Sequence, residues 1–276
     1  MEKKVKKIQK TYKRVLTIAG SDSGGGAGIQ ADLKSIAANG CYGMSVITAL
    51  TAQNTEGVFG IYPVPVDFVQ QQLQVVLSDI GSNAIKIGML FSSELIEMIA
   101  SELRAHLAKN IVLDPVMIAT SGDKLLKDEA VEALKTHLIP LAHLITPNLP
   151  EASVLLGREI TTLGELRDAA VELSDLGCPN VLIKGGHLEE GDCDDLLYMA
   201  ETGKVCTYPV KRIETNNNHG TGCTLSSAIA AGLAKGESVE DAVTAGKEYI
   251  TGAIRSGADY KIGGGHGPVD HFYKFF

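Results

Sequence analysis

Polar residues and glycines gather at the ends of short apolar runs, where a sheet protein would bind a ligand. Six runs lead directly into such residues, in segments 20–26, 51–54, 88–89, 114–115, 146–148 and 184–187. In open α/β sheets, ligands bind beyond the carboxyl ends of the strands. Each segment alone could be a turn, but six of them in one chain predict a ligand-binding crevice.

The glycine-rich segment 216–225 carries the strongest chemical signal. Gly220, Thr221 and Gly222 would present free backbone N–H groups at the start of a helix of small residues, which suits a phosphate. Cys223 would lie at the same helix end, where the positive field favours a thiolate. A lone cysteine is most often a small buried hydrophobe. Its place in the glycine loop favours a functional role.

An earlier glycine cluster, residues 20–28, leads into the pattern G-x-G-x-x-A at residues 26–31. A nicotinamide enzyme would need an acidic residue after the second strand, and this chain has Gln53 and Asn54 there. No G-K-[ST] follows, so the segment is not a P-loop either. Three consecutive glycines favour close approach of a ligand over a plain flexible turn. Asp32, in the following helix, either reaches that ligand or faces solvent.

Four polar residues farther along could hold a metal or a phosphate. Asn148 and Glu151 stand three apart at a predicted helix start, where they either point together at such a ligand or form a capping box. Asp114 ends an apolar strand, where a carboxylate has few structural roles. Lys184 also ends a strand and faces the crevice by position, although a solvated lysine is the simpler interpretation.

The elements that must position these residues alternate in type. Strands are predicted at 15–19, 44–51, 85–89, 111–113 and 180–184, with a hairpin formed by 195–200 and 205–210. Helices are predicted at 29–39, from Asp67, from Ser93, from Thr162 to Gly177, from Gly222 and from Ser238. Asp67 and Ser93 are the expected N-caps of their helices, and Thr162 forms a capping box with Glu165. The alternation indicates a mostly parallel sheet covered by helices.

Composition narrows the class of protein. The 276 residues are 45% hydrophobic and 21% charged, as in ordinary globular proteins, and the formal net charge of -8 disfavours a nucleic-acid partner. Residues 1–14 hold seven of the 25 Lys and Arg residues and are expected to form a disordered basic extension, with 15–276 as a single domain.

The five cysteines include no C-x-x-C pair, so neither a disulfide framework nor a zinc site is indicated. No membrane span or signal peptide is predicted, and a cytoplasmic location is expected.

Together the motifs resemble the hydroxymethylpyrimidine/phosphomethylpyrimidine kinases of thiamin biosynthesis, a branch of the ribokinase-like superfamily. The resemblance rests on segments 20–32, 51–54, 114–117, 146–152, 184–187, 219–223 and 265–269, and covers the chain from about residue 15 to its end. It implies a three-layer α/β/α fold, with a mostly parallel central sheet, helices on both faces and a small lid. It also implies ATP and Mg²⁺ as cofactors and a homodimer.

The resemblance further implies a role for each candidate residue. The pyrimidine would be bound by Gln53, Gly20, Asp32, Met89 and Val116. ATP and its phosphates would be bound by Lys184, Asn148 and Glu151, and magnesium by Asp114 and Glu151. Gly220, Thr221 and Gly222 would form the anion hole for the transferred phosphoryl group. Cys223 would be the base, where relatives acting on sugars have an aspartate.

The implied activity is ATP-dependent phosphorylation of 4-amino-5-hydroxymethyl-2-methylpyrimidine and then of its monophosphate, with residues 24–26 and the anion hole as room for the second phosphate. The alternative is a pyridoxine/pyridoxal salvage kinase. Such relatives carry an extra cysteine soon after the D-P-V-M segment, so Ala119 favours the pyrimidine. Asn218 replaces a common threonine and leaves the contacts before His219 open. A non-catalytic pyrimidine- or thiamin-binding module and, more distantly, a nicotinamide oxidoreductase are the alternatives from other classes.

Overall fold

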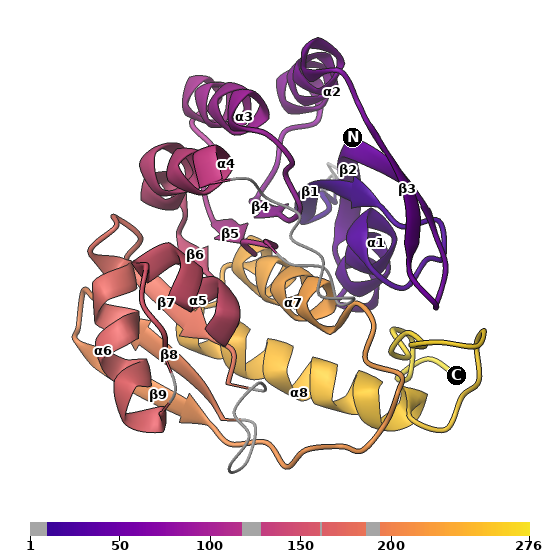
Figure 1. The fold of residues 1–276 in the computed structure, drawn as a ribbon. Coiled ribbons are helices and arrows are strands. Elements are labelled where there is room, and N and C mark those ends of the chain that lie inside the picture. Colours follow the sequence, from indigo (N-terminus) through magenta and orange to yellow (C-terminus); the bar gives the residue numbers. More distant parts are fainter. Residues whose placement is uncertain (1–9, 118–127, 161, 186–193) are drawn as a thin grey trace, which may run out of the picture.

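The computed structural model describes residues 10–117, 128–160, 162–185 and 194–276 (Figure 1). Within them, nine strands form one sheet in the order β3-β2-β1-β4-β5-β6-β7-β8-β9. The strands are β1 (Arg14–Ser21), β2 (Tyr42–Gln53), β3 (Val58–Pro63), β4 (Ala84–Ile87), β5 (Ile111–Leu113), β6 (Leu144–Ile145), β7 (Asn180–Ile183), β8 (Asp195–Met199) and β9 (Lys204–Tyr208).

Strand direction confirms the mostly parallel sheet. The six strands from β2 to β7 pair in parallel, and β3, β8 and β9 are added antiparallel at the two edges. β8 and β9 form the predicted hairpin. The chain first builds outward from β1 through β2, and then continues on the other side of β1 with β4. This change of direction puts a topological switch point at the carboxyl ends of β1 and β4, where open sheets bind their ligands.

Helices cover both faces, which confirms the three layers. They are α1 (Gly28–Ala38), α2 (Val66–Asp79), α3 (Ser93–Ala105), α4 (Asp128–Ala133), the short turns η1 (Leu134–Leu138) and η2 (Ile139–Leu141), α5 (Leu149–Leu156), α6 (Leu163–Ser174), α7 (Thr221–Lys235) and α8 (Val239–Gly257). One buried cluster packs α2 to α6 against the sheet, and the other packs α1, α7 and α8 against the opposite face (Figure 1). Alternation supplies both clusters: Ile111 and Leu113 enter the first, and Val112 between them enters the second.

Several predicted boundaries need correction by a few residues. The residue that caps α3 is Ser92, not Ser93, because its side chain accepts the N–H of Leu95. Asp67 is not an N-cap but lies in the first turn of α2, after Pro65. The Thr162–Glu165 capping box and the Ser238 cap are confirmed. α6 ends at Ser174, and the glycine predicted to stop it lies in the turn beyond.

The N-terminal boundary also shifts by one residue. Arg14, assigned from sequence to the basic extension, is the first residue of β1, and its side chain donates to the carbonyl of Ile80 and to Asn83 Oδ1. Residues 10–13 are exposed, and residues 1–9 lie outside the described part of the chain. Among the helices that the structure describes, none is long and apolar enough to cross a bilayer.

Candidate active site

The polar segments predicted from sequence follow strands that run in parallel. Their carboxyl ends therefore meet at one edge of the sheet, where β1 leads to the first glycine loop, β5 to Asp114 and β7 to Lys184. α7 packs across β1, β4 and β5, and it begins directly after Gly220. The helix N-terminus and the strand ends thus converge beside the switch point.

A cation, a carboxylate and a helix N-terminus meet at Gly222. Lys184 Nζ lies 2.8 Å from Asp114 Oδ1, and Thr146 Oγ1 donates to the same oxygen at 3.2 Å. A Cβ added to Gly222 would lie 3.4 Å from both Asp114 Oδ2 and Lys184 Nζ. The absence of a side chain at Gly222 therefore leaves the first turn of α7 open towards both charges. Lys184 and the first turn of α7 can stabilise an anion, and Asp114 can stabilise a cation bound to that anion.

The two carboxylates of this cluster have opposite pKa shifts. Burial would raise the pKa of Asp114, but the ammonium of Lys184 and then that of Lys86 outweigh it and hold the pKa below its ordinary value. Burial raises the pKa of Glu151 to about 7; the neighbouring Asp114 adds to this effect, while Lys184, 4.0 Å away, opposes it. At neutral pH Asp114 is ionised, whereas Glu151 is poised to gain or lose a proton.

Asn148 and Glu151 form the capping box that was the structural alternative for them. Asn148 Oδ1 accepts the N–H of Glu151 at 2.8 Å, and Glu151 Oε2 accepts the N–H of Asn148 at 2.8 Å. The box fixes the start of α5 and, with it, the position of Glu151 beside Lys184. The side-chain oxygen of Asn148 is occupied by this role, which leaves its NH₂ group for any ligand.

The carboxylates fit magnesium of the kind that accompanies a nucleotide. In the described part of the chain, no three His, Cys, Asp or Glu residues are grouped to hold a metal by themselves. Mg²⁺ bound with phosphates needs only one or two carboxylates and keeps several waters. Asp114 Oδ2 is the freer of its two oxygens, since its nearest donor is Ser226 Oγ at 3.4 Å.

The residues assigned to the pyrimidine separate into two groups. A Cβ on Gly20 would come within 2.7 Å of Met89 Cε, so Met89 lies directly over Gly20. The backbone of Gln53 is tied to the first glycine loop by Ser23, whose hydroxyl accepts from Gln53 N at 2.9 Å and donates to Gln53 O at 2.8 Å. Val116 is half-buried just beyond Asp114, and its backbone N–H donates to the carbonyl of Asp114 at 2.8 Å. Gly20, Met89, Gln53 and Val116 therefore lie at the edge of the sheet, whereas Asp32 lies beneath that edge.

Asp32 neither faces solvent nor reaches the open edge. It is fully buried and lies 3.0 Å from Lys86 Nζ, which is also fully buried. Its two oxygens also accept hydrogen bonds from the hydroxyls of Thr17 (2.6 Å) and Ser227 (2.8 Å). Burial alone would lower the pKa of Lys86, but Asp32, with Cys223 and Asp114 adding to it, raises that pKa above its ordinary value. The pair is therefore a charged layer under the site.

Cys223 lies over this layer. It is half-buried, and its sulfur faces the backbone N–H of Gly28 at the start of α1. The expected depression of its pKa by the helix end is wrong, because burial raises the pKa of Cys223 to about 11. Lys86 pulls in the opposite direction, while Asp32 and Asp114 add to the rise. At neutral pH the thiol therefore carries its proton.

The first glycine loop binds a carboxylate of the protein itself. Asp22, 3% exposed, accepts the N–H groups of Gly24 (2.8 Å), Gly26 (3.0 Å) and Ala27 (2.8 Å). These amides are consequently unavailable to a substrate phosphate, so the predicted contribution of residues 24–26 is limited to space for one. The glycines leave space, but the donors are already used.

Sequence reasoning missed Asp22, Lys86 and His219 as parts of the site. The signal for Lys86 was available: a lysine between two isoleucines on a buried strand has to be paired. Asp22 in a run of glycines and serines could equally have been a solvated turn residue. The partnership of His219 with Asp22, 197 residues earlier, was not visible in the local pattern.

A buried histidine contacts the first turn of α7. His271 is 5% exposed, and its Nε2 lies 3.1 Å from Thr224 Oγ1, the residue after Cys223. Burial, reinforced by the charge of Lys34, lowers the pKa of His271 to about 4. The native state therefore favours the neutral ring.

We expect His271 to lower the free energy of unfolding in mild acid. An unfolded chain protonates its histidine near pH 6.5, so the contribution of His271 is present above that pH and falls as the pH approaches 4, by up to about 3 kcal/mol. Urea unfolding between pH 7.5 and 4.5 measures this effect. The free energy of unfolding should fall less in His271→Gln than in the wild type as the pH is lowered. Parallel losses would contradict this expectation.

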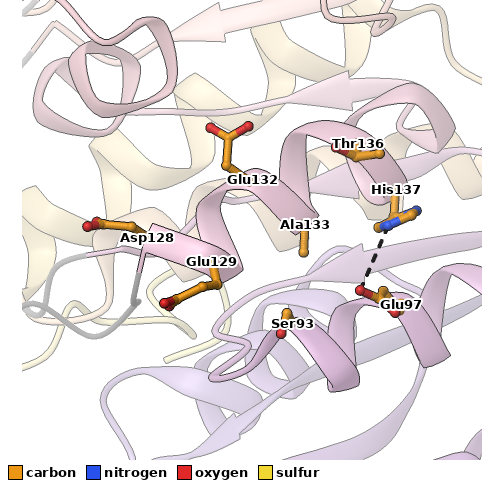
Figure 2. A pocket seen from close by; sticks show the side chains of 8 residues that line it. All are labelled: Ser93, Glu97, Asp128, Glu129, Glu132, Ala133, Thr136 and His137. Carbon is orange, nitrogen blue, oxygen red and sulfur yellow. Dashed lines mark ion pairs between the residues drawn. The ribbon is translucent and has the colours of Figure 1, made fainter.

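A depression between α3 and α4 is separate from the site (Figure 2). Its lining includes Glu97, Glu129, Glu132 and His137 and none of the residues predicted to bind substrate or nucleotide. His137 pairs loosely with Glu97, 4.0 Å away. An acidic surface of this kind would repel a nucleotide.

Known proteins share both this arrangement and the sequence. The family model of phosphomethylpyrimidine kinase matches residues 22–270. The hydroxymethylpyrimidine/phosphomethylpyrimidine kinase of Rhizobium meliloti is 50% identical over 95% of this chain and 97% of its own length. The thiamine biosynthesis bifunctional protein ThiED of Geobacter sulfurreducens is 52% identical over 93% of this chain, which spans about half (52%) of that longer protein.

Solved structures of related kinases share the fold of this chain. The solved pyridoxal kinase of Staphylococcus aureus in complex with ADP superposes with a TM-score of 0.88, at 36% identity, over 96% of each chain. The three layers and parallel core described above are thus the ribokinase-like fold expected from the motifs. With a family match over most of its length and near-full-length relatives at about half identity, the chain belongs to the phosphomethylpyrimidine kinase family.

Proposed function

We propose that this protein transfers the γ-phosphoryl group of ATP to the hydroxymethyl group of 4-amino-5-hydroxymethyl-2-methylpyrimidine and then a second phosphoryl group to the monophosphate. The observation that carries the proposal is the meeting of Lys184, Asp114 and the first turn of α7 at Gly222. Phosphoryl transfer needs positioning and charge stabilisation more than covalent chemistry. The family match and the relatives' names support the substrate class.

Each group has a distinct task in this reaction. The amides of Gly220 and Gly222 stabilise the equatorial oxygens of the transferred group, and Lys184 balances their charge. The amide of Thr221 would join them by exchanging the carbonyl of Asn218, to which it donates at 3.3 Å, for the phosphate. The substrate oxygen forms a bond to phosphorus as the bond to the ADP oxygen breaks. Cys223 acts as its thiolate, formed when the thiol loses its own proton to solvent, and Sγ then accepts the proton of the substrate hydroxyl. Asp114 and Glu151 would hold magnesium, which supplies further charge neutralisation on the phosphates.

The pyrimidine would lie at the other end of the same edge. Gln53, Gly20, Met89 and Val116 line that end, and Asp32 contributes from below through Lys86 and Cys223 rather than by contact. Asn148 would contact ATP only through its NH₂ group, since its oxygen caps α5. Gln53 is the one residue of the four that can offer both a donor and an acceptor to a ring.

A pyridoxal kinase is the second candidate, because the superposed Staphylococcus aureus enzyme carries that name. Ala119, which favours the pyrimidine, lies outside the described residues. ADP release with Mg·ATP, measured in parallel on the hydroxymethylpyrimidine, its monophosphate and pyridoxal, separates the candidates. Turnover of the monophosphate supports the proposal. Turnover of pyridoxal alone would replace it, and no ADP release with any of the three would indicate a binding protein.

We also propose a homodimer formed through the β2–β3 hairpin. β3 is an edge strand, and the hairpin exposes apolar side chains on both sides: Leu50 opposite Tyr62, and Phe59 beside Ile61 on the other face. The exposed fractions of Phe59 and Tyr62, 71% and 67%, are high for aromatic residues. Uncovered edges of this kind favour pairing with another chain.

The expected result is that Phe59→Lys/Tyr62→Lys yields a monomer by light scattering coupled to size exclusion, because two charges cannot be buried in an apolar interface. The matched control is Val75→Lys on α2, where the residue is 58% exposed and outside the hairpin. It should remain dimeric. A monomeric wild type, or a dimeric double variant, would contradict the proposal.

A further inference from the structure

The Asp22 carboxylate reaches beyond its own loop. Besides the three loop amides, its Oδ2 lies 2.9 Å from His219 Nε2. Burial would raise the pKa of Asp22, but His219 and the amides of Ala27 and Gly24 outweigh it and lower the pKa below the ordinary value. An ionised carboxylate can only accept a hydrogen bond. His219 Nε2 therefore carries a hydrogen and donates it to Asp22.

His219 is held rigidly between the two glycine loops. Its N–H donates to the carbonyl of Gly267 at 3.0 Å, and a Cβ on Gly26 would come within 2.5 Å of its ring. The next residue, Gly220, has φ +78°, and a side chain there would overlap the carbonyl of Gly26. The histidine thus adjoins both the anion hole and the first loop, with its ring packed against Gly26.

The amide of Gln53 lies between this histidine and a threonine. Gln53 Nε2 is placed 3.4 Å from His219 Nε2, and Gln53 Oε1 is placed 3.1 Å from Thr51 Oγ1. The two ends of an amide have nearly the same shape, so the hydrogens of the neighbouring groups decide which end is oxygen. The Thr51 hydroxyl has a single hydrogen, and its shorter contact is to the carbonyl of Ser21, at 2.8 Å. With that hydrogen used, Thr51 offers a lone pair to Gln53.

The donors and acceptors around Gln53 therefore allow one orientation of its amide. Nitrogen towards His219 would set two N–H groups against each other, whereas oxygen there is a second, longer acceptor of the same Nε2–H that Asp22 accepts at 2.9 Å. The NH₂ group then faces the lone pair of Thr51. Both neighbours favour the same orientation, so the order of acceptor and donor along the outer edge of the amide is set before a ligand arrives.

We propose that Asp22, His219 and Thr51 are positioning residues for ring recognition, which fix the Gln53 amide so that it meets a ring nitrogen and an adjacent amino group in one order. This inference rests on the proposed function, because it takes Gln53 as the residue that contacts the ring. An aminopyrimidine presents that acceptor–donor pair. A pyridine with a phenolic hydroxyl does not, so the fixed amide discriminates between the two substrate classes.

The test measures binding of the hydroxymethylpyrimidine without ATP, by calorimetry, with ATP binding as an independent check on folding. His219→Leu and Thr51→Val are each expected to raise the Kd for the pyrimidine about ten-fold, the effect of one hydrogen bond. The Kd for ATP should not change. His219→Gln, whose amide nitrogen can replace Nε2, and Thr51→Ser should restore most of the binding.

A double-mutant cycle decides whether the positioning residues act through Gln53. Gln53→Leu alone should weaken pyrimidine binding, and adding His219→Leu should weaken it no further. Additive losses would overturn the inference, as would unchanged pyrimidine binding in both Thr51→Val and His219→Leu. If His219→Leu does not fold, Thr51→Val against Thr51→Ser gives the answer. A wild type that binds no pyrimidine would instead refute the proposed function.

Discussion

Replacing Cys223 by alanine is expected to lower kcat by about 10²- to 10⁴-fold, the usual contribution of a positioned general base. The KM values for ATP and for the pyrimidine should change little. The reason is geometric: the sulfur faces Gly28 N–H above the Lys86–Asp32 pair, while the groups that bind phosphate, Lys184 and Asp114, lie at Gly222. Alanine removes the proton acceptor and leaves those charges in place.

The matched control is Cys206→Ala. Cys206 is also partly exposed but belongs to β9, at the far edge of the sheet, and its removal should leave kcat unchanged. The thiol pKa of about 11 adds a pH signature. Below that pH the deprotonated fraction grows with pH, so log kcat of the wild type should rise by up to about one per pH unit in mildly alkaline solution. A normal kcat in Cys223→Ala would exclude the base role.

Replacing Lys86 by methionine is expected to destabilise the protein by about 3–5 kcal/mol, because it leaves the buried carboxylate of Asp32 without its counter-charge. Thr17 and Ser227 would still donate to that carboxylate, but neither carries charge. Urea unfolding measures the loss. The double variant Lys86→Met/Asp32→Asn should recover much of it, since an amide needs no counter-ion.

Lys204→Met is the control for a lost lysine as such. Lys204 pairs with Glu240 at 2.6 Å, but the two side chains are 52% and 42% exposed. A solvent-screened pair contributes about 0–1 kcal/mol. Equal losses in Lys86→Met and Lys204→Met would show that the buried pair has no special role. A surviving fold with reduced kcat would instead connect Lys86 to the state of Cys223.

Much of the fold could be predicted because local sequence and global topology agree. Alternating residues such as Ile111, Val112 and Leu113 need apolar layers on both faces, and a run of such strands with helices between them has few other solutions. The errors lie at helix ends, where Ser92 and Ser93 are chemically equal and only backbone geometry selects the cap.

The candidate site was predicted unevenly for the same kind of reason. Lys184, Asp114 and the glycine loop before Cys223 each follow a strand or start a helix, so the sheet topology alone brings them together. The depth of Asp32 and its pairing with Lys86 were not visible, because a carboxylate on a helix looks the same whether its face is buried or solvated.

The sequence by itself determined the order of the elements, the edge at which ligands bind, and the family, since these depend on periodicity and on motifs that are local in the chain. Only the tertiary structure decided that Asp22 occupies the first glycine loop, that the Cys223 thiol keeps its proton, and that His219 lies against both Asp22 and Gln53. Desolvation and hydrogen-bond partnership depend on distances between residues far apart in the chain, and those distances exist only once the chain has folded.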